Sequence, residues 1–368
     1  MDDFIKILSP PFICNESESY YSCLEHKFKL FQNFLKESDF NGLLSTKDYS
    51  EIEVISKTLL ETIDEYLKGN SGDSYKKIES IFASGYFNPD NITYKLGKQN
   101  SLIRIRKSAT NLHKRNDLFH IPFVQRQKVA KQRFSIEGLP CLYLAATSYT
   151  AWLELNKPNF NEIWVSAFRT TAEIPIFDLS YTLSKLLTDF GILEDLDKTE
   201  VVDKLKLFPV VLATSFRVKY PNDFFHQEYI VSGKLLQWIV NNTKFKGIRF
   251  LSTKLESYDN NEYLWCASNF VIPPENHSRE ELYNEFLRTT FRLTKPQNWS
   301  VLLAYSNAGN VTAFAGGDAN FNEFTAENLS DKDLSSGIDE LIFENYINTA
   351  FYNVDGYLNR LFKFDVIE

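Results

Sequence analysis

The sequence contains few of the residues that build metal sites, disulfide frameworks or glycine-rich phosphate loops. Of its 368 residues, four are cysteine and 14 are glycine. The cysteines are scattered, without a CxxC pair or a His/Cys cluster, which argues against a structural zinc site and against a disulfide framework. No Gly-rich fingerprint of a dinucleotide-binding fold is present either. The four cysteines are Cys14, Cys23, Cys141 and Cys266.

Long apolar runs are also missing. No uninterrupted stretch approaches the roughly 20 residues of a membrane span. The N-terminal sequence MDDFIKILSPPF lacks the basic start and apolar core of a signal peptide. We therefore expect a cytoplasmic protein without membrane association. Hydrophobic residues make up 43% of the chain and charged residues 24%, which is typical of a globular protein with a well-buried core.

Charge is distributed unevenly along the chain. The net charge is -8, which argues against a general nucleic-acid binder, because such proteins need a broad basic face. Residues 101–135 nevertheless hold nine Lys or Arg against a single acid, Asp117. An apolar, aromatic stretch, residues 139–155, follows and contains one carboxylate, Glu154. A solvated helix face is the ordinary explanation of a basic run, whereas a pocket for a small phosphorylated substrate explains both features.

Hydrophobic periodicity predicts an α+β fold in three parts. Residues 1–95 read as a helical N-terminal domain, residues 96–275 as a mixed β domain that carries the function, and residues 276–368 as a C-terminal α/β extension of unknown role. In the first part, Ser50 and Glu53 resemble a helix capping box, and Gly69 a helix end. Strands are expected at 102–106, 141–145, 163–168, 174–179, 208–216, 247–251 and 263–273, and helices at 148–155, 182–207 and 228–240.

The last part is harder to interpret. Residues 279–292 and 341–362 show helical spacing of apolar side chains. Residues 301–305 and 310–315 are expected to pair as a hairpin around Asn307-Ala308-Gly309.

Three segments resemble the RES family, whose members include NAD-degrading toxins of bacterial toxin–antitoxin systems. They are the RIR strand at 104–106, the stretch RFSIEGLPCLYLAATSYTAWLE at 133–154, and EYIVSGKLLQWIVNNTKFKGIRFLSTK at 228–254. The resemblance covers about residues 100–275. It implies a fold similar to that of ADP-ribosyltransferases, and cleavage of the nicotinamide–ribose bond of NAD, with NAD as substrate and no cofactor.

The resemblance also implies which residues form the site. The family's catalytic glutamate falls on Glu154, its serine on Ser252, its tyrosine on Tyr143, and its arginines on Arg133 and on Arg104, with Arg106 as an equal candidate for the latter position. Ser252 lies so far after Glu154 that an insertion is expected around residues 180–207. His120 is a further candidate for the pocket, although a packed, hydrogen-bonded histidine is the simpler interpretation. His113, His226 and His277 have no partners at ligand spacing, so no metal is expected.

These residue types suit the chemistry. The bond to be broken joins a sugar to a pyridinium, which leaves as a neutral molecule, so one carboxylate near the ribose is enough. Two arginines can bind a pyrophosphate through bidentate hydrogen bonds. A tyrosine ring can stack on nicotinamide and a serine can bind its carboxamide or a ribose. Taken singly, each of these residues has an ordinary structural explanation.

Three functions remain open at this point. The first is an NAD glycohydrolase, or a phosphorylase if phosphate replaces water. The second is an ADP-ribosyltransferase, which often carries a second acid two residues before the catalytic glutamate, where this chain has Trp152. The third is a binding module whose basic segment docks nucleic acid or an acidic partner. For the first two, we expect an antitoxin or another inhibitory partner, or restraint by residues 1–95 and 276–368.

Overall fold

The N-terminal helices pack along one apolar face each, as their sequences predict. Helix α2 (Tyr20–Glu37) buries Leu24, Phe28 and Phe31, which recur at spacings of three and four residues.

The computed structural model describes residues 2–37, 42–192, 198–241, 244–255, 258, 264–276, 281–307 and 346–368. These residues form two units, each made of separate stretches of chain: unit 1 comprises 1–94, 129–139 and 175–261, and unit 2 comprises 95–128, 140–174 and 262–368.

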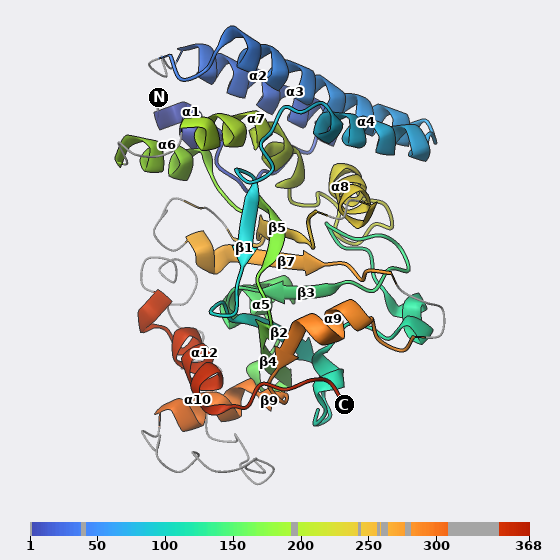
Figure 1. Ribbon diagram of the computed structural model, residues 1–368, viewed down its shortest axis with the longest axis vertical. Helices are drawn as coiled ribbons and strands as arrows, with labels where there is room; N and C mark the ends of the chain where they lie inside the picture. The colour runs from blue at the N-terminus through green and yellow to red at the C-terminus, as the bar shows by residue number, and fades with distance from the viewer. Residues whose placement is uncertain are drawn as a thin grey trace. The chain divides into compact units, whose positions relative to one another are not determined.

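Unit 1 is mainly helical. Its helices α2 and α3 pack on α7, and α3 and α4 pack on α8 (Figure 1). Strand β5 pairs with β6 in parallel, and β1, at the junction with unit 2, lies on the other side of β5. The elements are α1 (Asp2–Ile7), α2, α3 (Thr46–Leu67), α4 (Ser71–Ala83), β1 (Thr93–Leu96), β5 (Ile174–Leu179), α6 (Leu183–Ile192), α7 (Lys198–Thr214), α8 (Ile230–Asn241) and β6 (Ile248–Leu251).

Unit 2 is built on an antiparallel sheet in the order β7-β3-β2-β4-β8, with β9 also paired to β4. Helix α5 packs on β2 and β3, and helices α10 and α12 pack on each other and on β4. The elements are β2 (Leu102–Lys107), β3 (Leu142–Ala145), α5 (Ser148–Glu154), β4 (Ile163–Thr170), β7 (Ser268–Ile272), α9 (Glu285–Thr290), β8 (Phe291–Leu293), β9 (Gln297–Asn298), α10 (Trp299–Asn307) and α12 (Ala350–Leu361).

The α+β class is therefore confirmed, with both parallel and antiparallel strand pairs. Helices α6 and the first part of α7 occupy the stretch around 180–207 where an insertion was expected. None of the helices in the described part of the chain is both long and apolar enough to cross a membrane. The three-part division at residues 95 and 275 stays a prediction.

Four expectations about individual elements are wrong. Residues 208–216 do not form a strand, because α7 continues to Thr214; its second half is buried on all sides, so it lacks the polar face that marks a surface helix. Residues 301–305 lie in helix α10, and the hairpin partner 310–315 lies outside the described residues. Of 279–292, the structure describes 281–292, and within these only Glu285–Thr290 is helical, with β8 directly after it. Of 263–273, residues 264–267 form a 3-10 turn before β7.

The predicted capping box of α3 is also misplaced. The helix begins at Thr46, and its cap is Ser45 with Asp48 in place of Ser50 with Glu53. The Ser45 main-chain N–H donates to Asp48 Oδ2 at 2.8 Å. The expected end is right: Lys68 caps the helix and Gly69 follows with a φ of +89°, a conformation that favours glycine.

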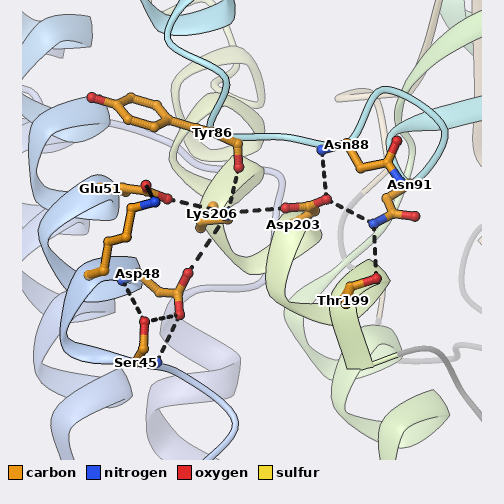
Figure 2. Close-up of polar contacts among 10 residues, drawn as sticks. Ser45, Asp48, Glu51, Tyr86, Asn88, Asn91, Thr199, Asp203 and Lys206 are labelled. Carbon is orange, nitrogen blue, oxygen red and sulfur yellow. Dashed lines mark hydrogen bonds and ion pairs between the residues drawn. The ribbon is translucent and has the colours of Figure 1, made fainter.

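A buried lysine joins α3 to α7 in unit 1 (Figure 2). The ammonium of Lys206 lies 3.1 Å from Asp203, 3.3 Å from Glu51 and 3.8 Å from Asp48, and it donates to the carbonyl of Tyr86 at 2.5 Å. Burial lowers the pKa of Lys206, but Asp203 and Glu51 more than offset this, so that the pKa lies above its usual value. The lysine therefore stays charged and holds three carboxylates together.

Candidate active site

Strand β2 carries both candidate arginines. Ile103 and Ile105 are buried, whereas Arg104 and Arg106, which alternate with them along the strand, are half-buried. Because successive side chains of a strand point to opposite faces, the two guanidinium groups lie on the same face. The predicted strand and its basic face are confirmed.

The two guanidinium groups have little to neutralise them. Arg104 Nη1 donates to the main-chain carbonyl of Tyr143 at 3.1 Å. Among the described residues, neither arginine makes an ion pair with a carboxylate. The charge of Asp117 raises the pKa of Arg106 without an ion pair between them. Asp117 Oδ2 instead accepts hydrogen bonds from the main-chain N–H groups of His113 and Lys114. Burial, with the neighbouring charge of Arg106, lowers the pKa of Arg104 to about 9, and burial lowers that of Arg106 too. Such like charges held together favour binding of an anion.

Glu154 is the last residue of helix α5. The helix begins after Thr147, whose hydroxyl accepts the N–H of Thr150 at 3.1 Å. At the other end, Glu154 Oε1 accepts a hydrogen bond from Asn269 Nδ2 at 2.6 Å. A short hydrogen bond from a buried amide fixes the direction of the carboxylate.

Tyr143 lies on the same face of the sheet as this amide. In the β3–β7 pairing, Tyr143 is opposite Val271, and Ala145 is opposite Asn269. Residues directly opposite each other, and those two positions further along, share a face. The Tyr143 side chain is a neighbour of the Cys141 thiol, and burial raises its pKa well above the ordinary value, so the hydroxyl stays neutral. The structure thus joins Asn269 and Glu154 on the sheet face that also carries Tyr143. Ile103, paired with Ala145, shares that face, so the side chains of Arg104 and Arg106 start from the other face, from which Arg104 Nη1 reaches the Tyr143 carbonyl.

His120 is held by both ring nitrogens. It is 1% exposed, its Nδ1 lies 2.8 Å from the carbonyl of Ile121, and its Nε2 accepts the main-chain N–H of Asn284 at 3.0 Å. These contacts identify the His120 ring as the neutral tautomer that carries its proton on Nδ1. Burial, together with the charge of Arg104, lowers the pKa of His120 to about 4. The side chain is thus packed beside the arginines, with neither ring nitrogen open to a substrate, so its place as a pocket residue is not supported.

Arg133 and Ser252 lie in unit 1, where they are neighbours. The Arg133 guanidinium donates to the carbonyls of Thr214, at 3.1 Å, and Leu251, at 2.5 Å, and stacks on Phe250 with 4.6 Å to the ring centroid. Leu251 ends β6 and Ser252 follows, fully buried, with its hydroxyl accepting the N–H of Lys254 at 3.2 Å. Arg133 thus supports the backbone that holds Ser252. Its predicted role in substrate binding stays a prediction.

Of the seven candidates, five belong to unit 2 and two to unit 1. Sequence reasoning missed Asn269, the partner of Glu154. The only available signal was one amide within the apolar run ASNFVIPP, since a buried amide needs a hydrogen-bonding partner. Among the residues that the structure describes, no group of three or more His, Cys, Asp or Glu could hold a metal ion.

Comparison with known proteins adds one similarity. A protein of Bacillus subtilis (strain 168) named "Putative toxin YopC" is 27% identical to this chain over 272 residues. The match covers 70% of this chain and 61% of that protein, so the chain spans about three fifths of its relative's length. No family model matches the sequence, and no solved structure matches the chain. The resemblance to the RES family and to the ADP-ribosyltransferase fold therefore stays a prediction.

Proposed function

We propose that this chain is an NAD glycohydrolase of the RES type that acts as a toxin. The observation that carries the proposal is the pair Arg104 and Arg106, two close guanidinium groups that make no ion pair with a carboxylate among the described residues. A pyrophosphate would supply the missing negative charge and accept bidentate hydrogen bonds. The relative named as a toxin supports the biological role alone.

Glu154 supplies the second requirement, one oriented carboxylate. In the proposed reaction the bond between C1 of the ribose and the nicotinamide nitrogen breaks, and its electron pair leaves with nicotinamide, which becomes neutral. Glu154, held by Asn269, lies near the ribose, where it stabilises the positive charge that develops on the sugar. Stabilisation of this kind amounts to about 3–4 kcal/mol. Water then adds to C1 and releases a proton, giving ADP-ribose; phosphate in place of water would give the phosphorylated sugar.

Tyr143 is the residue that we assign to the nicotinamide ring. It shares a sheet face with Asn269, and its neutral hydroxyl and aromatic ring suit stacking on a pyridinium. Roles for Ser252 and Arg133 in NAD cleavage rest on the family resemblance alone.

Transfer of ADP-ribose to an acceptor is less well supported. Position 152, where transferases of this fold often carry an acid, holds a tryptophan that stacks on Phe160 with 5.1 Å between the ring centroids. Its Nε1 donates to the carbonyl of Pro158 at 2.8 Å. This residue is part of the core and offers no charge to an acceptor.

The test is nicotinamide release from NAD by the purified full chain. We expect release by the wild type and at least a hundredfold less by Glu154→Gln, which keeps the side-chain shape and removes the charge. Glu173→Gln is the matched control, because Glu173 is an exposed acid of unit 2 away from these contacts. Circular dichroism confirms the fold of each variant.

Two outcomes would overturn the proposal. Equal release by wild type and Glu154→Gln would remove the glutamate from the chemistry. The second outcome combines two results. The wild type releases no nicotinamide, alone or after removal of any copurified inhibitory partner, and the protein binds nucleic acid with an affinity that falls steeply with salt. Together these results would favour the binding module instead.

A further inference from the structure

Unit 1 contains a cavity of about 520 Å³ that includes none of the seven candidate residues. One wall is formed by residues 18–20 at the start of α2, and the other by residues 219, 220 and 223–228 in the connection between α7 and α8. Its volume is within the range of sites that bind small molecules or single side chains. No role described so far requires this cavity.

Exposed aromatic side chains line the cavity. Phe224 is 102% exposed, and Tyr220 is 57% exposed. Phe225 is 44% exposed and stacks against Tyr66, with 6.2 Å between the ring centroids and an interplanar angle of 5°. A phenylalanine entirely in water contributes nothing to the core, whereas aromatic side chains dominate the binding energy of protein interfaces.

The polar side of the cavity is acidic. Glu228 Oε1 accepts the main-chain N–H of Lys219 at 3.0 Å, and Glu18 Oε2 accepts Asn15 Nδ2 at 2.9 Å. The carboxylate of Asp223 makes no hydrogen bond or ion pair with any residue in the described stretches of the chain, so it is open to a ligand.

The one ammonium group in the lining is already engaged. Lys219 Nζ donates to the main-chain carbonyls of Asn15, Glu16 and Glu18, at 2.8, 2.5 and 3.1 Å. All three of its N–H donors are therefore used within the protein. Its charge neutralises one of the three carboxylates in the lining and leaves the cavity negative.

Two aromatic rings beside the cavity already attract cations of the chain. The Lys219 ammonium lies 5.3 Å from the centroid of the Tyr220 ring, and the Lys131 ammonium 5.0 Å from that of Phe225. Phe224 carries no such cation in the described structure. A ring of this kind favours a flat cation more than an ammonium, because a guanidinium can stack on it.

We propose that this cavity binds an arginine side chain presented by a partner polypeptide. The guanidinium stacks on Phe224 and donates hydrogen bonds to Asp223, while the aliphatic part of the side chain and its apolar neighbours cover Tyr220. An anionic ligand would meet the carboxylates, and a purely apolar one would bury Asp223 without a partner. The docking site shares no residue with the proposed NAD site, so a failure of one proposal does not affect the other.

The experiment compares two peptides that differ in charge alone. The probes are acetyl-Gly-Leu-Arg-Leu-Gly-amide and the same peptide with citrulline, the neutral isostere of arginine, titrated against the full chain by saturation-transfer NMR. We expect the arginine peptide to bind at least tenfold more tightly, because hydrogen bonds to charged groups are the stronger ones. Spermine, titrated in parallel, tests whether a free polyamine uses the same cavity.

Variants locate the binding. Asp223→Asn and Phe224→Ala should each weaken binding of the arginine peptide at least fivefold. Neither should disturb the fold, since Phe224 is fully exposed and the Asp223 carboxylate makes no hydrogen bond or ion pair with the described residues. Glu53→Gln and Val54→Ala, two exposed positions of α3, are the matched controls. Equal binding of both peptides, no effect of either cavity variant, or tighter binding of spermine than of the arginine peptide would each overturn the proposal.

Discussion

Replacing Asp355 by asparagine should make the protein more stable at neutral pH. Asp355, on α12, is 9% exposed, and its Oδ2 accepts the main-chain N–H of Ser148 at 2.9 Å and the hydroxyl of Tyr346 at 2.7 Å. Among the described residues, its Oδ1 has no hydrogen-bonding partner, and neither has the Ser148 hydroxyl. Burial raises the pKa of Asp355 to about 6, although both partners favour the charged form.

The magnitude follows from the shift in pKa. The ordinary value is 3.8, so the folded state binds the proton more tightly than the unfolded state by roughly 3 kcal/mol. That contribution to the free energy of unfolding is fully present below pH 3.8 and is lost as the pH rises through 6. Asp355→Asn lacks the buried charge, and its amide can donate to the Ser148 hydroxyl. At pH 8 we expect it to be about 2–3 kcal/mol more stable than the wild type, and at pH 4 equally stable.

Urea unfolding followed by tryptophan fluorescence measures this difference. Trp152 and Trp299 lie in the core of unit 2 against Phe351 of α12, with 5.6 and 5.1 Å between the ring centroids. Wild type and Asp355→Asn are compared at pH 4, 6 and 8, with the exposed acid variant Glu173→Gln as control. A variant that is less stable than the wild type at pH 8, or a difference that does not change with pH, would refute the argument.

Two further predictions concern buried charges. Lys206→Met leaves Asp48, Glu51 and Asp203 without their shared cation, so it should lower the free energy of unfolding by about 3–5 kcal/mol. Adding Asp203→Asn should recover part of that loss. Urea unfolding measures both changes, and a midpoint equal to that of the wild type would contradict the network. Arg106→Gln removes a positive charge that repels Arg104, so the variant should unfold thermally at the same temperature as the wild type or higher. The Kd for NAD should rise at least tenfold, because a charge-assisted contact is lost. A lower unfolding temperature with unchanged NAD binding would contradict the assignment of Arg106 to the substrate site.

The elements that the sequence predicts best are those whose two faces differ. The alternation in β2 and the helical spacing of Leu24, Phe28 and Phe31 survive in the structure because each element has one buried and one open side. The second half of α7 is buried on every side, so no periodicity separates it from a buried strand. At the start of α3, several Ser and acidic residues offer caps, and the local pattern alone does not select Ser45.

The candidate site is predictable to a similar degree. Residue type and spacing lead to Glu154 and to the paired arginines, but the orientation of a side chain depends on partners that are distant in sequence. Asn269, which binds Glu154, is 115 residues away, and Asn284, which binds His120, is 164 residues away. Contacts of that range are set by strand pairing and tertiary packing, which a single sequence does not reveal.

The discontinuous make-up of unit 1 has a consequence for synthesis of the chain. Helix α4 ends at Ala83, whereas α7 and α8, against which α2–α4 pack, begin at Lys198 and Ile230, so at least 114 residues (84–197) separate them. At roughly 5–20 residues per second, a ribosome needs about 6–23 s to cover that distance. For that time the apolar faces of α2 and α3 stay open, which exposes the nascent chain to aggregation and to binding by chaperones. A partner that captures those faces during translation would prevent unit 1 from forming at all, and would restrain the protein before any active site exists.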